Sequence, residues 1–491
     1  AGAITGSSAE AVTLNSGTTG GATVAVGTIG ASNQIHTVNI TGTDGVTLNG
    51  DITTDNTASA SVDIAGPVTL GADITIDTDA TDHGGSITFA STATINGGQS
   101  LTMISGAGDI ALQGVIGNST ALTGLSVNAT NGDDGDIEIT DIGDGDPAAG
   151  VAGTVAIGNA NTASLTLDGT RYNTNGTTTY EAVAGSGSIK ITGDNVSITT
   201  ADDDLTFDAG NIVLSTAGTT TISTGTGAGN LQIDGTIDGT NNQAENLTIT
   251  TGSGSATLDG TIGGTTPLTT ISINAAQAGA INLVGIGDTD TVGTTGGGTA
   301  TVGHTTTTTL TLDGSFYSTD GLQLYTAKAG QNIDITGTSA AFTTTNDNVT
   351  FATAGVDLNN NGTTTINTGT GTGAVSFAAA IETNGGNDDI LTITSGTGTV
   401  TFTGAIGATQ ELGGLNVNAS SGNGEIVFTS TIGDTNAPQS GVIGTTNIGN
   451  TSTTKVNLDA ALYSFDGTTT FEATSGETFE ISAATTIETA G

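Results

Sequence analysis

Apolar and polar residues alternate in short runs along the whole chain. In one stretch, the runs LTIT (247–250), ATL (256–258), ISIN (271–274) and INL (281–283) place an apolar residue at every second position. They are separated by segments rich in Gly, Ser, Thr and Ala, which favour turns. An apolar residue at every second position predicts a strand with one buried face, and no apolar stripe at helical spacing persists. The pattern therefore predicts an all-β chain of short strands.

The runs return with a regular period. The second apolar residue of successive runs is Ile233, Leu258, Leu283 and Leu312, with spacings of 25, 25 and 29 residues. A period of this length is typical of solenoids, in which each turn packs only against its neighbours. We therefore predict a parallel β-helix, a β-solenoid of roughly 20 turns of about 25 residues, in which Leu258 points inward. The alternative is a series of tandem β-sandwich domains, which would show a repeat near about 100 residues with linkers, and no linker is visible.

A longer repeat encloses the short one. The segments that begin at Leu101, Leu247 and Leu391 share one pattern, at offsets of 146 and 144 residues. At about 25 residues a turn, this long repeat predicts roughly six turns. We expect one continuous solenoid over residues 1–491. Its long repeats are expected at approximately 1–75 (partial), 76–221, 222–365 and 366–491 (truncated).

Residues 247–273 (LTITTGSGSATLDGTIGGTTPLTTISI) carry a family resemblance. Two apolar-Thr-apolar runs, the second followed by a Gly-x-Ile-Gly-Gly type turn, resemble the β-strand repeats of large bacterial surface proteins, the filamentous-haemagglutinin-like adhesins. The resemblance extends over nearly the whole chain. It implies a right-handed parallel β-helix, a secreted protein at the bacterial cell surface, and a structural or adhesive role.

Composition narrows the function classes. The 491 residues include 79 Gly, no Trp and 3% aromatic residues, which suits a narrow interior better than the core of a large globular domain. The 47 Asp and Glu against 4 Lys and Arg give a net charge of −43. Nucleic acids and anionic membrane surfaces both require clustered cations, so neither is an expected partner. There is no Cys for a disulfide or a thiolate zinc site, and no apolar run is long enough for membrane insertion.

Acidic residues gather in residues 131–146 (NGDDGDIEITDIGDGD). Carboxylates from adjacent loops are suited to Ca²⁺, which takes about six to eight oxygen ligands. Calcium is therefore a candidate ligand, although no cofactor is required and the EF-hand spacing is not present. The alternative is that Asp and Asn form turns at solvated corners. The candidate ligands are Asp133, Asp134, Asp136, Asp141, Asp144 and Asp146, with the repeat equivalents Asp288, Asp290 and Asp434.

All five tyrosines occupy one part of the long repeat. Tyr172, Tyr317 and Tyr463 are equivalent, and so are Tyr180 and Tyr325. Two rings eight residues apart would suit stacking on a glycan. The more frequent role of such rings is packing against the body of the protein, and we expect packing here.

Residues for catalysis are sparse. His36, His83 and His304 do not fall at equivalent positions of the repeat, and the four cations are scattered. A hydrolase or lyase needs converging acids, bases or cations at one irregular place, so we expect no enzyme. N-x-Ser/Thr sequences, for example at Asn128 and Asn418, are mostly chance in a chain so rich in these residues.

Together these patterns predict a structural subunit of an extracellular filament or surface layer. The expected partner is a second copy, in a head-to-tail homopolymer joined through terminal turns, because residues 1–8 and 477–491 contain no pattern of a capping helix. Glycans or divalent cations would bridge such acidic rods. One alternative is an adhesin passenger segment that binds a host or surface ligand. A weaker alternative is a carbohydrate-active β-helix enzyme.

Overall fold

The computed structural model describes the chain except for sixteen short segments. The segments outside the description are residues 1–2, 7–9, 18–19, 32–33, 56, 80–83, 130–134, 145–149, 216, 241–243, 275–278, 289–292, 385–387, 435–440, 477–478 and 490–491.

The described residues form a β-solenoid. They contain strands and turns but no helix, so none of them forms a helix that could cross a membrane. Every strand pairing among them is parallel. Because sandwich domains are built from antiparallel strands, the tandem-sandwich alternative is wrong and the parallel β-helix is confirmed. The chain divides into two compact units, residues 1–240 and 241–491, and the division falls inside the long repeat expected at 222–365.

Unit 1 winds through three parallel ladders, each named here after one inward residue. The Leu112 ladder comprises β1 (Ala11–Asn15), β3 (Thr37–Thr41), β6 (Ser61–Ala65), β9 (Ser86–Phe89), β12 (Ile110–Leu112), β14 (Ile137–Ile139), β16 (Leu165–Leu167), the second halves of β18 (Thr178–Ile191) and β20 (Leu205–Leu214), and β23 (Ile237–Asp238). The Tyr172 ladder comprises β2 (Val24–Val26), β4 (Val46–Leu48), β7 (Val68–Leu70), β10 (Ile95–Asn96), single bridges at Ile116 and Ile142, β17 (Arg171–Thr174), β19 (Ser197–Thr200) and β21 (Gly218–Ser223). The Met103 ladder comprises bridges at Ile4 and Ile29, β5 (Ile52–Thr53), β8 (Ile74–Asp77), β11 (Ser100–Ile104), β13 (Gly124–Val127), β15 (Val155–Ile157), the first halves of β18 and β20, and β22 (Leu231–Ile233).

Unit 2 has the same construction. The Leu258 ladder comprises β25 (Ala256–Leu258), β27 (Ile281–Leu283), β29 (Leu310–Leu312), β32 (Asn332–Ile335), β35 (Gly355–Leu358), β38 (Ile381–Thr383), bridges at Ile406 and Ile432, β45 (Leu462–Phe465) and β48 (Thr486–Thr489). The Tyr317 ladder comprises bridges at Ile262 and Ile286, β30 (Phe316–Thr319), β33 (Ala341–Thr344), β36 (Thr363–Asn367), β39 (Ile390–Thr394), β41 (Gly414–Val417), β43 (Thr446–Ile448) and β46 (Thr469–Phe471). The Phe402 ladder comprises β24 (Glu245–Thr250), β26 (Thr270–Ile273), β28 (Ala300–Val302), β31 (Gln323–Thr326), β34 (Val349–Ala352), β37 (Val375–Phe377), β40 (Val400–Phe402), β42 (Ile426–Phe428), β44 (Val456–Leu458) and β47 (Phe479–Ile481).

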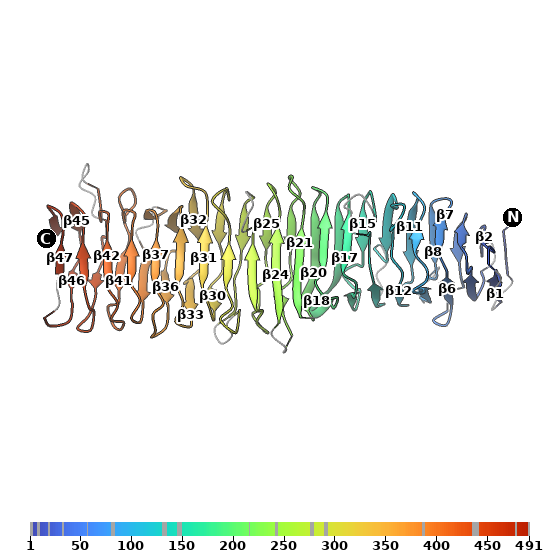
Figure 1. Cartoon of the computed structure of the whole chain (residues 1–491), viewed down its shortest axis with the longest axis horizontal. Coiled ribbons are helices and arrows are strands. Elements are labelled where there is room, and N and C mark those ends of the chain that lie inside the picture. Colours follow the sequence, from blue (N-terminus) through green and yellow to red (C-terminus); the bar gives the residue numbers. More distant parts are fainter. Residues whose placement is uncertain are drawn as a thin grey trace. The chain divides into compact units, whose positions relative to one another are not determined.

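The alternation of the sequence decides which side chains enter the interior. In β25, Ala256 and Leu258 are buried and Thr257 between them is only half-buried. Leu258 is 1% exposed and pairs with Leu283 on the next turn, so its inward orientation is confirmed. Neighbouring strands of one ladder lie side by side in each unit (Figure 1), about 4.8 Å apart.

The long repeat does not contain a whole number of turns. In unit 2, Leu258 and Phe402 are equivalent in sequence, at an offset of 144 residues, but they lie on different ladders. Counting only the described strands and single bridges that belong to the three ladders, from one residue to the other, gives 17 steps. At three steps per turn, the long repeat is five and two-thirds turns, which is close to the roughly six turns expected but is not a whole number. Tyr317 and Tyr463 are also equivalent and also lie on different ladders.

Aromatic rings stack inside the Phe402 ladder. Tyr325, Phe351, Phe377, Phe402 and Phe428 lie on successive turns with ring centroids 4.8 to 5.5 Å apart and are all buried. Parallel in-register pairing places each ring over its counterpart, which gives the offset-stacked contact that aromatic pairs prefer. The interior of unit 2 is therefore held by ring stacking as well as by aliphatic packing.

Candidate functional site

Of the candidate calcium ligands, Asp133, Asp134, Asp146 and Asp290 lie outside the described residues. The described candidates are Asp136, Asp141, Asp144, Asp288 and Asp434. No three His, Asp or Glu side chains of the described residues are grouped so that they could hold a metal ion. The calcium site therefore stays a prediction.

One candidate ligand has a clear structural role. Asp141 Oδ1 accepts hydrogen bonds from the backbone N–H groups of Thr170 and Arg171, both at 2.8 Å. These two residues belong to the next turn of unit 1. Asp141 therefore acts as a turn residue at a corner of the solenoid, which was the alternative to calcium binding. Other Asp residues make the same kind of contact. Asp51 and Asp73 accept from the N–H groups of Thr75 and Ser100 one turn on, again at 2.8 Å.

The candidate Asp residues at equivalent positions of the long repeat also do not lie along one side of unit 2. Asp288 follows Ile286 of the Tyr317 ladder, whereas Asp434 follows Ile432 of the Leu258 ladder. The two positions are equivalent in the long repeat but lie at different corners of unit 2, because the repeat is five and two-thirds turns long.

Three buried asparagines form hydrogen bonds between neighbouring turns that the sequence analysis did not predict. Asn128, Asn274 and Asn418 are at most 1% exposed and have φ angles of 47° to 50°, in the left-handed region that Asn tolerates. The side-chain oxygen of Asn274 accepts from the N–H of Thr251 one turn back, and its amide donates to the Thr251 hydroxyl, both at 2.8 Å. Asn128 and Asn418 make the same pair of contacts with Ser105 and Ser395. Their burial removes Asn128 and Asn418 as glycan acceptors, and their shared offsets of 146 and 144 residues were the signal that could have found them.

The tyrosines are part of the interior. All five are 0% exposed, so the glycan-stacking alternative is wrong and packing is confirmed. Tyr317 donates its hydroxyl to the carbonyl of Leu283 and accepts from the N–H of Gly314, both at 2.8 Å. Tyr172 and Tyr463 make the same two contacts with the equivalent backbone groups. Each hydroxyl thus satisfies two backbone groups at a corner where the chain would otherwise leave them buried and unpaired.

The second pair of tyrosines gives a matched test of stability. Tyr325 donates to the side-chain oxygen of Gln323 at 3.2 Å, whereas the equivalent Tyr180 has a buried hydroxyl with no hydrogen-bond partner. We expect Tyr325→Phe to lower the free energy of unfolding by about 1 kcal/mol. Tyr180→Phe is expected to leave it unchanged or to raise it, because a buried unpaired hydroxyl costs free energy. Urea unfolding of both variants measures the difference, and equal losses would contradict this assignment.

Carboxylates stack on adjacent turns of the outer surface. Asp334, Asp357 and Glu382 occupy paired positions of β32, β35 and β38 and are half-buried. Burial raises the pKa of all three groups, and the charge of Asp357 raises the pKa of Asp334 and Glu382 further. In unit 1, burial likewise raises the pKa values of Glu181 and Asp208, which pair in β18 and β20. At neutral pH, the carboxylates stacked on adjacent turns repel one another.

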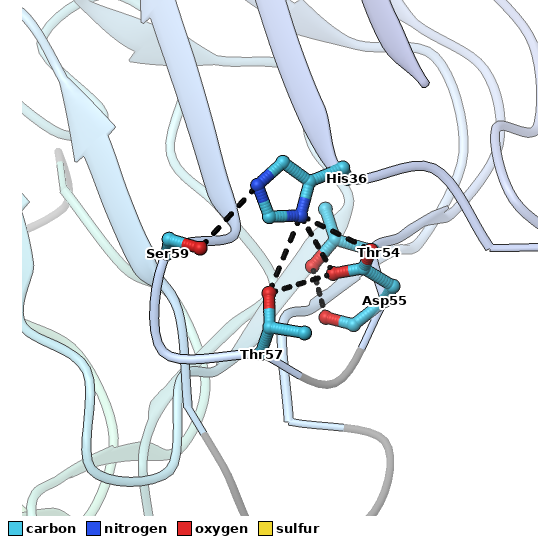
Figure 2. A network of polar contacts seen from close by, with 5 residues as sticks. All are labelled: His36, Thr54, Asp55, Thr57 and Ser59. Carbon is cyan, nitrogen blue, oxygen red and sulfur yellow. Dashed lines mark hydrogen bonds and ion pairs between the residues drawn. The ribbon is translucent and has the colours of Figure 1, made fainter. Parts of the chain in front are cut away.

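His36 lies at the centre of a polar network in unit 1, shown in Figure 2. Its Nδ1 is 3.0 Å from both carboxylate oxygens of Asp55, and its Nε2 is 3.4 Å from the hydroxyl of Ser59. Thr57 donates to Asp55 at 3.1 Å and its hydroxyl lies 3.3 Å from the same Nδ1. Ser59, His36 and Asp55 contact one another in the order found in serine hydrolases. The Ser59–His36 contact is long, however, and the Thr57 hydroxyl contacts the same ring nitrogen of His36 as Asp55 does. The network joins Asp55, Thr57 and Ser59 to His36 of the preceding turn, and the expectation that the chain is no enzyme stays a prediction.

The last described turn of unit 2 exposes its apolar side chains. Phe479 and Ile481 of β47 are 45% and 53% exposed, and Ile487 of β48 is 47% exposed. They pair with Val456, Leu458 and Tyr463, which are all buried. These three side chains therefore occupy inward positions of the solenoid that no further turn covers among the described residues.

A lysine side chain stabilises the same turn through ion pairs. Lys455 of the preceding turn forms ion pairs with Glu425 at 3.3 Å and with Glu480 of β47. The two carboxylates raise the pKa of the Lys455 ammonium group, which therefore stays charged. β47 is thus held in register although its inner side chains, Phe479 and Ile481, are exposed.

Comparisons of the chain with protein-family models, with curated proteins and with solved structures gave no match. The identity of the chain therefore rests on its own features, a parallel β-solenoid with braced corners and an apolar last turn.

Proposed function

We propose that this protein is a structural subunit of an extracellular filament or surface layer, joined head to tail through terminal solenoid turns. The observation that carries the proposal is the parallel, in-register stacking of the turns, in which polar side chains such as those of Asp141 and Asn274 bond to the backbone of neighbouring turns. An unpaired strand of a parallel ladder is a template for further pairing, and exposed apolar side chains in inward positions, here Phe479, Ile481 and Ile487, favour being covered.

A second copy is the occupant we propose for this surface. In unit 1, Ile4 is 36% exposed, and β1 alternates half-buried and exposed positions, so its inward residues Val12 and Leu14 are also only partly covered. Each unit is a coil of three parallel ladders, so a turn of one copy can pair with a turn of another in the same parallel manner. Contact between two different ends of a chain does not close on itself and produces a fibre.

The roles of the described polar residues agree with a structural function. Asp141, Asn274 and Tyr317 form hydrogen bonds with backbone groups of neighbouring turns. The secreted, bacterial cell-surface location belongs to this proposal and is supported by the resemblance of residues 247–273 to adhesin repeats.

Placing a charge on the last turn is the direct test. We expect Ile487→Glu to abolish linear assembly, because it buries a carboxylate against the next copy, a cost of several kcal/mol. Sedimentation velocity and negative-stain microscopy of purified protein measure the assembly. Thr401→Glu, in which the same charge is added to the outer face of β40, is the matched control and should assemble as the parent does.

Two results would overturn the proposal. One is a parent protein that stays monomeric at every concentration and salt level tested. The other is assembly of the Ile487→Glu variant to the same extent as the parent.

A further inference from the structure

A polar groove crosses four successive corners of unit 2. It lies on the loops that follow β36, β39, β41 and β43 of the Tyr317 ladder and has a volume of about 610 Å³. The four loops are consecutive rungs of one ladder, so the groove follows the ladder over three steps, about 14 Å.

The loops are locked to one another by hydrogen bonds. Thr397 donates through its N–H and its hydroxyl to the carbonyl of Gly371, at 2.6 and 3.0 Å. Asn423 N–H donates to the carbonyl of Gly396 at 2.7 Å, and the Asn450 amide donates to the carbonyl of Gly422 at 2.8 Å. Each loop is therefore tied to the loop before it, and the shape of the groove is formed in advance of any ligand.

A glycine lets one of the lining loops lie close against the loop before it. A Cβ atom at Gly396 would lie 2.2 Å from the backbone carbon of Thr370, a distance that no side chain tolerates. The loop at this rung has five residues, 395–399, whereas the next loop, 418–425, has eight.

The lining carries no charged residue, and polar and apolar atoms contribute about equally to its surface. It consists of Asn, Ser, Thr and Gly residues, among them Thr370, Ser420, Ser421, Thr451 and Ser452. Hydroxyl and amide groups both donate and accept hydrogen bonds, as the hydroxyls of a sugar do. In a chain of net charge −43, the surrounding field repels an anionic ligand, and the groove offers no carboxylate to a cation.

We propose that this groove binds a neutral oligosaccharide laid along the ladder. The proposal is independent of head-to-tail assembly, since the groove lies on loops at 367–452 and the exposed apolar residues lie at 479–487.

The experiment uses the full chain and a panel of linear hexasaccharides. The neutral members are a maltose-type glucan, a cellulose-type glucan and a chitin-type oligomer, and the acidic member is hexagalacturonate. We expect saturation-transfer NMR and calorimetry to show binding of at least one neutral member and at least tenfold weaker binding of the acidic one.

Variants place the binding in the groove. Ser421→Asp with Thr451→Asp puts two carboxylates on the rim, and we expect at least tenfold weaker binding of the neutral ligand. Thr257→Asp with Thr401→Asp adds the same charge to outer strand positions of the other two ladders and should leave binding unchanged. If the rim variant melts early, Ser421→Ala with Thr451→Ala, which removes only hydroxyls, carries the same expected loss.

The proposal is overturned if no neutral member binds, if hexagalacturonate binds as tightly as the neutral ligands, or if the rim variants bind as the parent does. None of these outcomes depends on whether the protein forms fibres, so failure of this proposal and failure of the assembly proposal are distinguishable.

Discussion

Replacing Leu258 by aspartate is expected to unfold the turns around it. Leu258 is 1% exposed and packs inside β25 against Leu283 of the next turn. A carboxylate there has no cation or N–H donor to pair with in a narrow apolar interior, which costs several kcal/mol. Because each turn of a solenoid packs only on its neighbours, the damage should stay local at first. Thermal melts should show an early transition, and hydrogen exchange should show lost protection near residues 256–283.

Thr257→Asp is the matched control for this variant. It adds the same charge one residue away, at the half-buried outward position of β25. We expect its melting temperature to stay within a few degrees of the parent value, because surface substitutions rarely change stability by more than about 0.5 kcal/mol. Equal melting of the two variants would contradict the inward orientation of Leu258.

Acidification from pH 7.5 to about pH 5 is expected to stabilise the protein, opposite to the usual trend. Burial raises the pKa values of Asp334, Asp357 and Glu382 above their ordinary range. A carboxyl group whose pKa is higher in the folded state binds protons more tightly when folded. Its stabilising contribution is therefore fully present below the unfolded pKa and is lost as the pH rises through the folded pKa. The reduction of the net charge of −43 acts in the same direction.

Melting temperatures across this pH range, at two salt concentrations, measure the effect. We expect the gain on acidification to shrink at high salt, which screens exposed charges. Asp334→Asn, which removes one charge from the column on β32, β35 and β38, should raise the melting temperature at pH 7.5 and flatten its pH dependence. Below about pH 4, groups such as Asp73, whose pKa is lowered by hydrogen bonds from Ser100, should reverse the trend. A melting temperature that falls steadily from pH 7.5 would contradict the prediction.

The inward positions were predictable from the sequence because strand alternation and turn period act locally. The spacing that links Ile233 and Leu258 to their neighbours is set by in-register stacking, and the buried residues follow it. In the Leu258 ladder, successive paired positions are 23 to 31 residues apart. This variation lies in the corners, and it hid the fractional number of turns in the long repeat.

Polar contacts between turns were less accessible to sequence reasoning. Asn274 and Thr251 are 23 residues apart, and Tyr317 and Leu283 are 34 apart, so neither pair belongs to a local motif. The groove was missed for the same reason, since four loops separated by whole turns contribute to it. Asp141 carried the right chemistry for calcium, and only its two backbone donors show that its oxygen is used within the fold.

The step of 17 strand positions has a consequence for how such a chain grows by duplication. Seventeen is not divisible by three, so each copied segment of unit 2 places its loops one side further round than the segment before it. A copied strand must therefore fit on any side, which requires three sides of nearly equal width and similar inward residues. A protein that must present one flat surface, to ice or to a membrane, would lose that surface at each duplication. In such a chain, a motif that occurs once per long repeat is rotated about the solenoid axis by a third of a turn from one repeat to the next. Duplication therefore places copies of each loop on every side from which a neighbouring molecule could approach.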